Sequence, residues 1–162
     1  MDTGPEPKRM LLAIGQASLI VAGLFSAVGS ALHLACIPGG TAWYRFLGAG
    51  RRVVHFAEMG SALPAIYAVT IAAIVAGWSI YALSGAGVIR RLPFLRTILI
   101  LISLVSITRA AALPLLLEHM QDSGRSRCFL VTSSAIMLSM GMMYAVGIGL
   151  LWGELKISHR VN

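Results

Sequence analysis

The sequence predicts an all-α, polytopic membrane protein: a bundle of four transmembrane helices with a short interfacial segment in the first outer loop. Composition is the first observation, because 57% of the 162 residues are hydrophobic and only 12% are charged, whereas soluble domains are about a quarter charged. The second is a mean hydropathy of +0.82. The third is a set of four apolar stretches near or above the roughly 20 residues that a helix needs to cross a bilayer. We expect residues 1–162 to form a single membrane domain.

The first half of the chain is expected to hold two spans, at about 10–37 and 62–83. Pro38-Gly39-Gly40 should end the first span, because proline and glycine continue a helix poorly. The connection Thr41–Ser61 mixes aromatic with basic side chains, which is typical of the headgroup level of a bilayer. Within it, a mixture of apolar and charged residues predicts a short helix on the membrane surface, formed by Arg51, Arg52, Val53, Val54, His55, Phe56 and Glu58.

The second half is expected to hold two more spans, at about 97–117 and 128–152. Pro114 lies inside the third span and leaves the carbonyl of Ala110 without its usual helical partner, so we expect the last turns to bend. Small residues recur at four-residue steps on three spans and favour either close helix packing or self-association. These rows are Ala22, Ser26 and Ser30; Ala68, Ala72 and Ala76; and Gly141, Ala145, Gly149 and Gly153.

Arg109 is a charge inside the third apolar stretch. A charge at that depth costs at least ~2.5–3.5 kcal/mol on insertion scales, so it needs a partner, a wet cavity or a task. We expect it to pair with Glu58, because a guanidinium matches the geometry of a carboxylate. The four-span topology directs further ionisable groups toward the same face, namely His33, His55, Glu118 and His119. The cluster is either a structural pair that fixes helix packing or a ligand or transport site, unless Arg109 extends to the interface instead.

Other candidate chemistry is sparse. Cys36 and Cys128 are expected on the same outer side, where a disulfide could form in an oxidising compartment. No two histidines have the i, i+4 spacing of a metal site, and we assign neither a metal nor a cofactor. The sequence contains no H-E-x-x-H or G-x-S-x-G motif, which disfavours an enzyme. Methionines of the fourth span are interpreted as gap-filling side chains rather than Cu(I) ligands: Met137, Met140, Met142 and Met143.

The net charge of +7 comes from basic residues that flank the apolar stretches. This placement favours contact with anionic lipid headgroups and argues against nucleic acid as a partner. A tight turn holds Arg90, Arg91 and Arg96, and short basic loops stay on the cytoplasmic side. We therefore expect both termini to be cytoplasmic, and short loops in a compact chain indicate a bacterial inner membrane.

The segments GAGRRVVHFAEMGS (Gly48–Ser61) and YALSGAGVIRRLPFLR (Tyr81–Arg96), with Arg109, resemble a family of small four-span bacterial inner-membrane proteins of uncharacterised function. The resemblance covers about the middle half of the chain. It implies the four-span topology and a bacterial origin, and it brings no activity, substrate or catalytic residue with it.

The expected function is non-enzymatic: a small inner-membrane subunit or accessory protein that acts through helix–helix and outer-face contacts. Its partners would be the lipid bilayer and either further copies of the chain or another membrane protein. The alternative is a small oligomeric transporter or channel for an anionic or protonatable solute, using the Arg109–Glu58 region. A haem- or metal-bearing redox protein is a third, less favoured interpretation.

Overall fold

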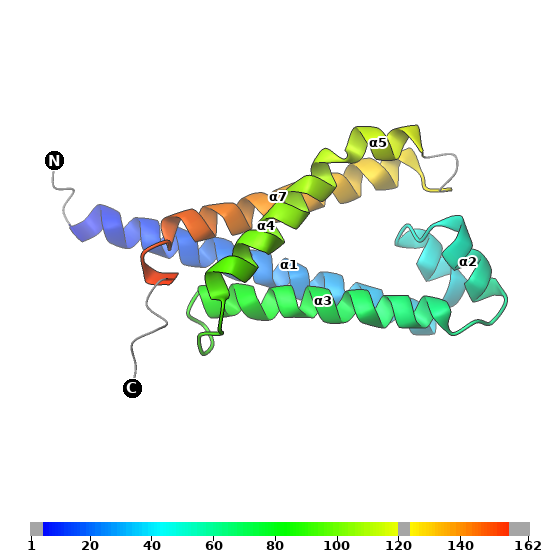
Figure 1. Ribbon diagram of the computed structural model, residues 1–162, viewed down its shortest axis with the longest axis horizontal. Helices are drawn as coiled ribbons and strands as arrows, with labels where there is room; N and C mark the ends of the chain where they lie inside the picture. The colour runs from blue at the N-terminus through cyan, green and yellow to red at the C-terminus, as the bar shows by residue number, and fades with distance from the viewer. Residues whose placement is uncertain (1–4, 120–123, 156–162) are drawn as a thin grey trace.

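The structure, a computed structural model, describes residues 5–119 and 124–155, and every regular element in these ranges is a helix. Figure 1 shows their arrangement along the molecule. The helices are α1 (Pro5–Phe46), α2 (Arg51–Glu58), α3 (Leu63–Gly85), α4 (Leu95–Ala111), α5 (Leu113–Glu118) and α7 (Arg127–Leu150).

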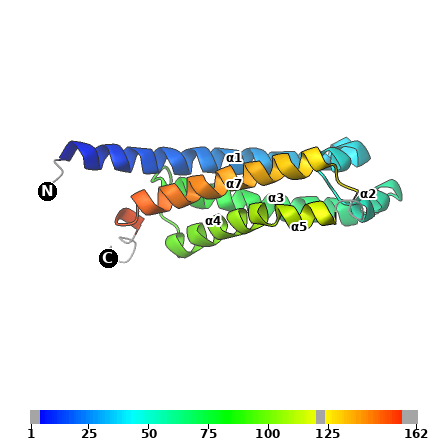
Figure 2. The same ribbon diagram turned by 90° about the horizontal axis from the view of Figure 1, so that it is seen from above.

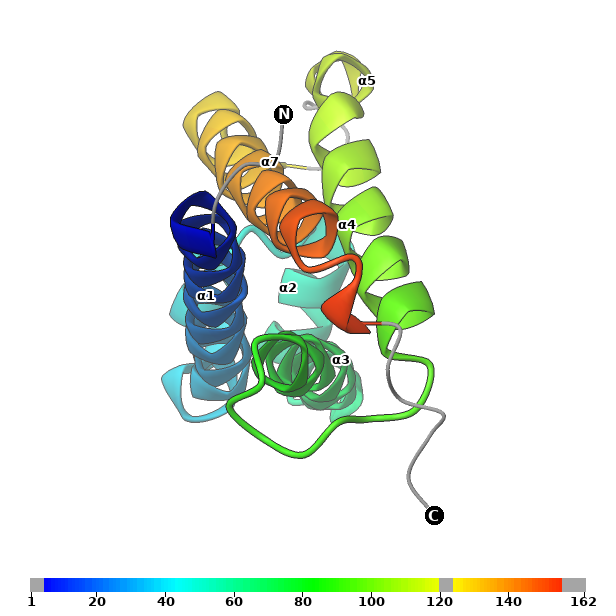
Figure 3. The same ribbon diagram turned by 90° about the vertical axis from the view of Figure 1, so that its left-hand side faces the viewer.

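The long helices pack as two pairs, α1 with α3 and α4 with α7, and the pairs meet mainly where α1 contacts α7. Seen along the molecule in Figure 3, α3, α1, α7 and α4 follow one another around the structure. In Figure 1 the α4–α7 pair diverges from the α1–α3 pair toward one end, and α2 lies at that end between them. We call this the α2 end; α1 begins and α7 finishes at the opposite, terminal end.

Three helices are long and apolar enough to cross a membrane by length and composition: Glu6–Phe46 within α1, all of α3 and all of α7. The third predicted span, 97–117, is divided instead between the 17-residue α4 and the six-residue α5, with Ala112 between them. Pro114 lies in the first turn of α5, where its missing N–H is harmless. The predicted bend at Pro114 therefore takes the form of a break, after which α5 continues toward the α2 end (Figure 2).

The outer surface of the helices is unusually apolar for a protein in water. Large apolar side chains such as Leu24, Val28 and Leu104 are more than half exposed, whereas several serines are buried, among them Ser26, Ser103 and Ser106. Serine hydroxyls join the two helices within each pair. Ser30 of α1 donates to the carbonyl of Ala72 on α3 at 2.8 Å, and Ser103 of α4 donates to that of Gly141 on α7 at 2.9 Å. Small residues at the helix contacts, hydroxyl bonds between helices and large apolar residues on the outer surface are together typical of packing within a lipid bilayer.

Tyr144 of α7 lies at the centre of the main core and is fully buried. Its hydroxyl lies 3.0 Å from that of Ser26 on α1 and 3.1 Å from the carbonyl oxygen of Trp78 on α3. The Ser26 hydroxyl is also 2.9 Å from the carbonyl oxygen of Ala22. The hydroxyls of Ser26 and Tyr144 have one hydrogen each, so two hydrogens are shared among these three contacts. The resulting network joins α1, α3 and α7 at one point.

The first long helix is interrupted at Gly40, within the Pro38-Gly39-Gly40 segment where the sequence predicts its end. What the sequence does not predict is that α1 resumes beyond this kink and runs to Phe46. Gly40 adopts φ 61° and ψ −154°, a conformation open mainly to glycine, so it absorbs the kink. Gly39 leaves room for the indole of Trp43, which would lie 2.1 Å from an added Cβ.

The predicted helix in the first loop is present as α2, at Arg51–Glu58. Its apolar face packs inward, with Val54 buried against Cys36, Tyr44 and Ala68. The apolar residues of α2 thus cover a second, smaller core, and its polar residues Arg51, Arg52, His55 and Glu58 lie exposed.

Candidate functional site

The α2 end is closed by contacts between the loop after α1 and the start of α7. Gly48 has φ +71°, and the ring of Phe129 lies where a Cβ at Gly48 would be, 2.0 Å from it. The Nε of Arg125 donates to the carbonyl oxygen of Gly48 at 2.7 Å. Ser126 caps α7 by accepting from the N–H of Phe129 at 3.1 Å. These contacts place Arg125 between two cavities, which share it and residues 47–49 as lining.

The first cavity, which we call the Arg109 pocket, has a volume of about 430 Å³ and lies between α1, α2, α3 and α4. Arg109, Arg125 and His33 line it, and no carboxylate does so among the described residues. The Nδ1 of His33 donates to the carbonyl oxygen of Gly29 at 2.8 Å, which fixes the ring on α1. The pocket is also lined by Cys36, Tyr44 and Tyr67.

Arg109 does not pair with Glu58, contrary to the expectation. In the described ranges the guanidinium of Arg109 bonds only to the hydroxyl of Ser134 on α7, at a long 3.5 Å. Glu58 instead forms an ion pair with Arg45 at 2.5 Å, and both side chains are largely exposed. The reason is topological: Glu58 is exposed on α2 beside Arg45, whereas Arg109 lines the Arg109 pocket, to which α2 contributes Val53 rather than Glu58. An exposed pair of this kind contributes about 0–1 kcal/mol, so it has little effect on stability.

The second cavity, which we call the α1/α7 groove, has a volume of about 880 Å³. Its polar lining comes mainly from Arg45, Arg51, Arg125 and Glu58, near α2. Its apolar lining includes Leu32 of α1, Val54 of α2, and Phe129 and Ile136 of α7. A smaller cavity of about 330 Å³ shares two lining residues with it and extends it along α7.

The predicted cluster is therefore divided. His33 and Arg109 line the Arg109 pocket, whereas His55 and Glu58 line the α1/α7 groove. Two other members of the predicted cluster, Glu118 and His119, are exposed at the end of α5 and line neither cavity.

The disulfide that the sequence leaves open between Cys36 and Cys128 is not formed, and both cysteines are free thiols. Cys36 is buried in the small core under α2, and Cys128 is exposed in the first turn of α7. Among the residues that the structure describes, no group of three or more His, Cys, Asp or Glu side chains could hold a metal ion.

Three arginines line these cavities and were not predicted as site residues, namely Arg45, Arg51 and Arg125. Arg45 and Arg125 looked like ordinary loop charges that set topology. Arg45 lies in the helical turn beyond Gly40, and Arg125 reaches the carbonyl of Gly48 across 77 positions of sequence. The one local sequence signal for Arg125 is its position directly before Ser126, the N-cap residue of α7.

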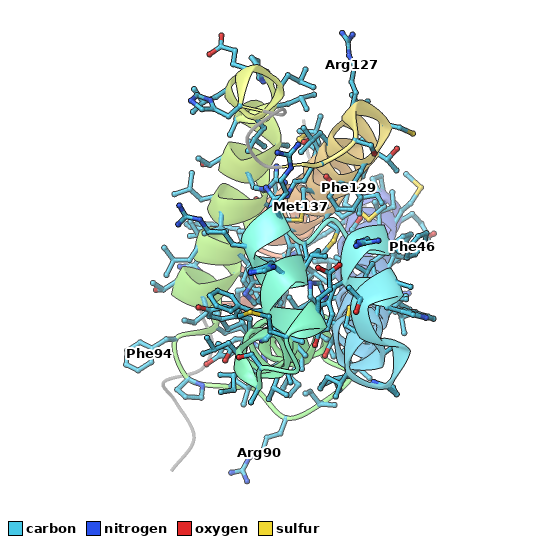
Figure 4. All side chains as sticks on the ribbon, turned by 90° about the vertical axis from the view of Figure 1, so that its right-hand side faces the viewer. Phe46, Arg90, Phe94, Arg127, Phe129 and Met137 are labelled. Carbon is cyan, nitrogen blue, oxygen red and sulfur yellow. The ribbon has the colours of Figure 1, made fainter. Side chains whose placement is uncertain are left out.

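The basic turn at the terminal end has a structural role. Arg91 and Arg96 donate to the carbonyl oxygens of Glu154 and Trp152, and the Arg96 guanidinium lies 3.8 Å from the centre of the Trp152 ring. Arg90 extends away from the helices (Figure 4). Two of the three arginines thus hold the segment that follows α7, beside any effect on topology.

Comparison with protein-family models, with curated proteins and with solved structures yields no match to this chain.

Proposed function

We propose that the chain is a membrane protein that binds a small anionic solute in the Arg109 pocket and transfers it through the membrane. The supporting observation is the guanidinium of Arg109, which lines this cavity beside His33 and in the described ranges bonds only to the hydroxyl of Ser134. Carboxylate and phosphate groups are the natural ligands of a guanidinium. A guanidinium shielded from bulk water also attracts an anion more strongly than an exposed one does.

The proposal includes four spans, with α4 and α5 together making the third crossing. From Leu95 to Glu118 the two helices provide about 35 Å at 1.5 Å per residue, against a hydrocarbon core of ~30 Å. Arg109 then lies about 21 Å along this path, near the α2 end. We further propose a bacterial inner membrane, with the termini and the basic turn on the cytoplasmic side, in accord with the positive-inside rule.

Flux measurements on purified protein in liposomes would test the solute-binding role. The probes are radiolabelled inorganic phosphate, sulfate and lactate, each with an outward proton gradient and without one. We expect uptake of at least one anion above protein-free liposomes. Arg109→Leu should abolish this uptake, whereas Arg109→Lys should retain part of it, because the charge remains while the paired donors are lost.

A matched control is Arg52→Gln, which removes an exposed arginine of α2 that lines neither cavity. Its uptake should equal that of the unmodified protein. If no probe enters, or if a well-folded Arg109→Leu protein transports normally, the anion-binding role is wrong. Size-exclusion profiles in detergent establish that each variant is folded.

The accessory role expected from the sequence stays a prediction, and one feature favours it. Gly149 of α7 is exposed, with open space around the position of a Cβ, and Ala145 lies exposed one turn before it. Such a surface lets another helix approach closely. A membrane protein that co-purifies in mild detergent at a fixed ratio would support this role over transport.

A further inference from the structure

We propose that the α1/α7 groove binds one anionic phospholipid, with its phosphate at Arg51 and one acyl chain along α7. The site is distinct from the Arg109 pocket, and it goes beyond the proposed transport function. Two properties of the groove carry the proposal, namely positive charge at one end and a continuous apolar seam leading away from it.

The charged end is lined by Arg45 and Arg51 of the first loop region and by one carboxylate, Glu58. Glu58 is already paired with Arg45. Arg51 has no carboxylate partner in the part of the chain that the structure describes, since the Arg45–Glu58 pair is the one ion pair there. The Arg51 side chain lies across Gly124, where a Cβ would come within 2.5 Å of it, so its course toward α7 is defined. This end of the groove therefore complements a phosphate.

The apolar end lies between two helices that can each span a membrane. Leu32 of α1 and Phe129 and Ile136 of α7 line the groove. The smaller cavity shares Ile136 and continues past Phe25 to Met143. From Phe129 to Met143 the seam is about 21 Å long, against a leaflet of about 15 Å, so one acyl chain can lie along it.

The same seam is open to the bilayer. Phe25 is 52% exposed and Ile136 is 48% exposed, so a lipid tail can enter sideways without helix separation. A soluble anion would use only the charged end and would leave the apolar seam unoccupied. An amphiphile with a negative headgroup matches both ends, which is why we assign a phospholipid rather than a free phosphate.

Native mass spectrometry of the full chain in mild detergent tests this assignment. Phosphatidylglycerol and phosphatidylcholine are titrated separately, and the fraction of protein with one bound lipid is measured. We expect phosphatidylglycerol to bind at one molecule per chain, about tenfold more tightly than phosphatidylcholine. Arg51→Gln should remove most of this preference, and Arg51→Lys should restore part of it. Arg127→Gln is the matched control, because Arg127 is exposed at the start of α7 and extends away from the groove (Figure 4).

The apolar seam is tested by Ile136→Trp, which fills it, against Leu138→Trp, which adds the same ring on the exposed face of α7 outside both cavities. We expect only Ile136→Trp to weaken phosphatidylglycerol binding, about tenfold. Equal binding of the two lipids by the unmodified protein overturns the proposal, and this comparison needs no variant to fold. Inorganic phosphate binding as tightly as the lipid, with no effect of Ile136→Trp, also overturns it. Normal lipid binding by Arg109→Leu would separate this site from the transport role.

Discussion

At the scale of single residues, the structure depends on a few polar atoms that lie where lipid excludes water. Tyr144 is the central example, because its hydroxyl joins α7 to α1 and α3 inside the core. In this setting an unmade hydrogen bond has no water to replace it, although measured bonds between membrane helices average only about 0.6 kcal/mol. The network around Tyr144 contains several contacts, so its removal should exceed that average.

We expect Tyr144→Phe to destabilise the protein by about 1 kcal/mol, because it removes the contacts with Ser26 and with the Trp78 carbonyl while keeping the ring. Thermal unfolding in detergent measures the effect. Tyr81→Phe is the control, since the Tyr81 hydroxyl makes one long contact, 3.5 Å from the carbonyl oxygen of Pro93. Equal melting temperatures for the two variants would show that the buried network contributes nothing.

A second residue-level prediction concerns Gly48. Gly48→Ala should be strongly destabilising for two reasons, a positive φ and a Cβ that would overlap the ring of Phe129. Gly60→Ala isolates the effect of the positive φ, because Gly60 has φ +72° but open space around a Cβ. We expect about 1 kcal/mol for Gly60→Ala, from the backbone alone. The overlap should add about 1–3 kcal/mol for Gly48→Ala.

Urea or thermal unfolding of both glycine variants gives this comparison. Cys128 lies in the same turn as Phe129, so its alkylation rate also reports whether the start of α7 has moved. If Gly48→Ala is no worse than Gly60→Ala, then Phe129 does not lock the loop to α7.

At the scale of elements, two prolines have different consequences. Pro114 separates α4 from α5, whereas Pro38 remains inside α1. The difference lies in the neighbouring residue, since Gly40 can adopt the conformation that redirects the chain two residues later. The turn beyond that kink carries Tyr44 into the small core and Arg45 to Glu58.

Gly40→Ala should therefore cost about 1–3 kcal/mol even though nothing lies within 4 Å of the new Cβ. Gly77→Ala is the matched control, because Gly77 is in the middle of α3 and also has open space around a Cβ. That control should leave the stability unchanged or raise it, since alanine favours a helix. The melting temperatures of the two variants in detergent measure this difference in stability. If Gly40→Ala melts at the same temperature as Gly77→Ala, the fold does not depend on the kink at Gly40.

The orientation of each helix decides whether its row of small residues packs inside the protein or lies on the surface. Ala22, Ser26, Ala68 and Ala72 are buried, so these rows pack inside the protein. The row on α7 is divided, because Gly141 faces α4 whereas Gly149 faces outward. A four-residue repeat on a straight helix drifts around its axis, so one row can serve both surfaces.

At the scale of the whole molecule, the four-span proposal predicts that opposite ends lie on opposite sides of the membrane. Two single-cysteine proteins test it: Cys36→Ser, which retains the exposed Cys128, and Cys36→Ser/Cys128→Ser/Arg90→Cys. A membrane-impermeant maleimide added to intact cells should label Cys128 only, and the Arg90→Cys protein should be labelled only after lysis. Labelling of both proteins from the same side would contradict the topology.

The sequence by itself determined that the chain is helical and apolar enough for a membrane, because composition and stretch length decide whether water or lipid is the better solvent. It also located α3 and α7 to within two residues at each end, and it marked the interruption at Pro114. The tertiary structure alone decided which charges meet. Arg109 and Glu58 have matching chemistry, but α2 turns Glu58 outward to Arg45 and leaves Arg109 beneath it with Ser134. The two cavities depend on the divergence of the helix pairs and on contacts such as Arg125 with Gly48, and no local pattern specifies contacts so distant in sequence.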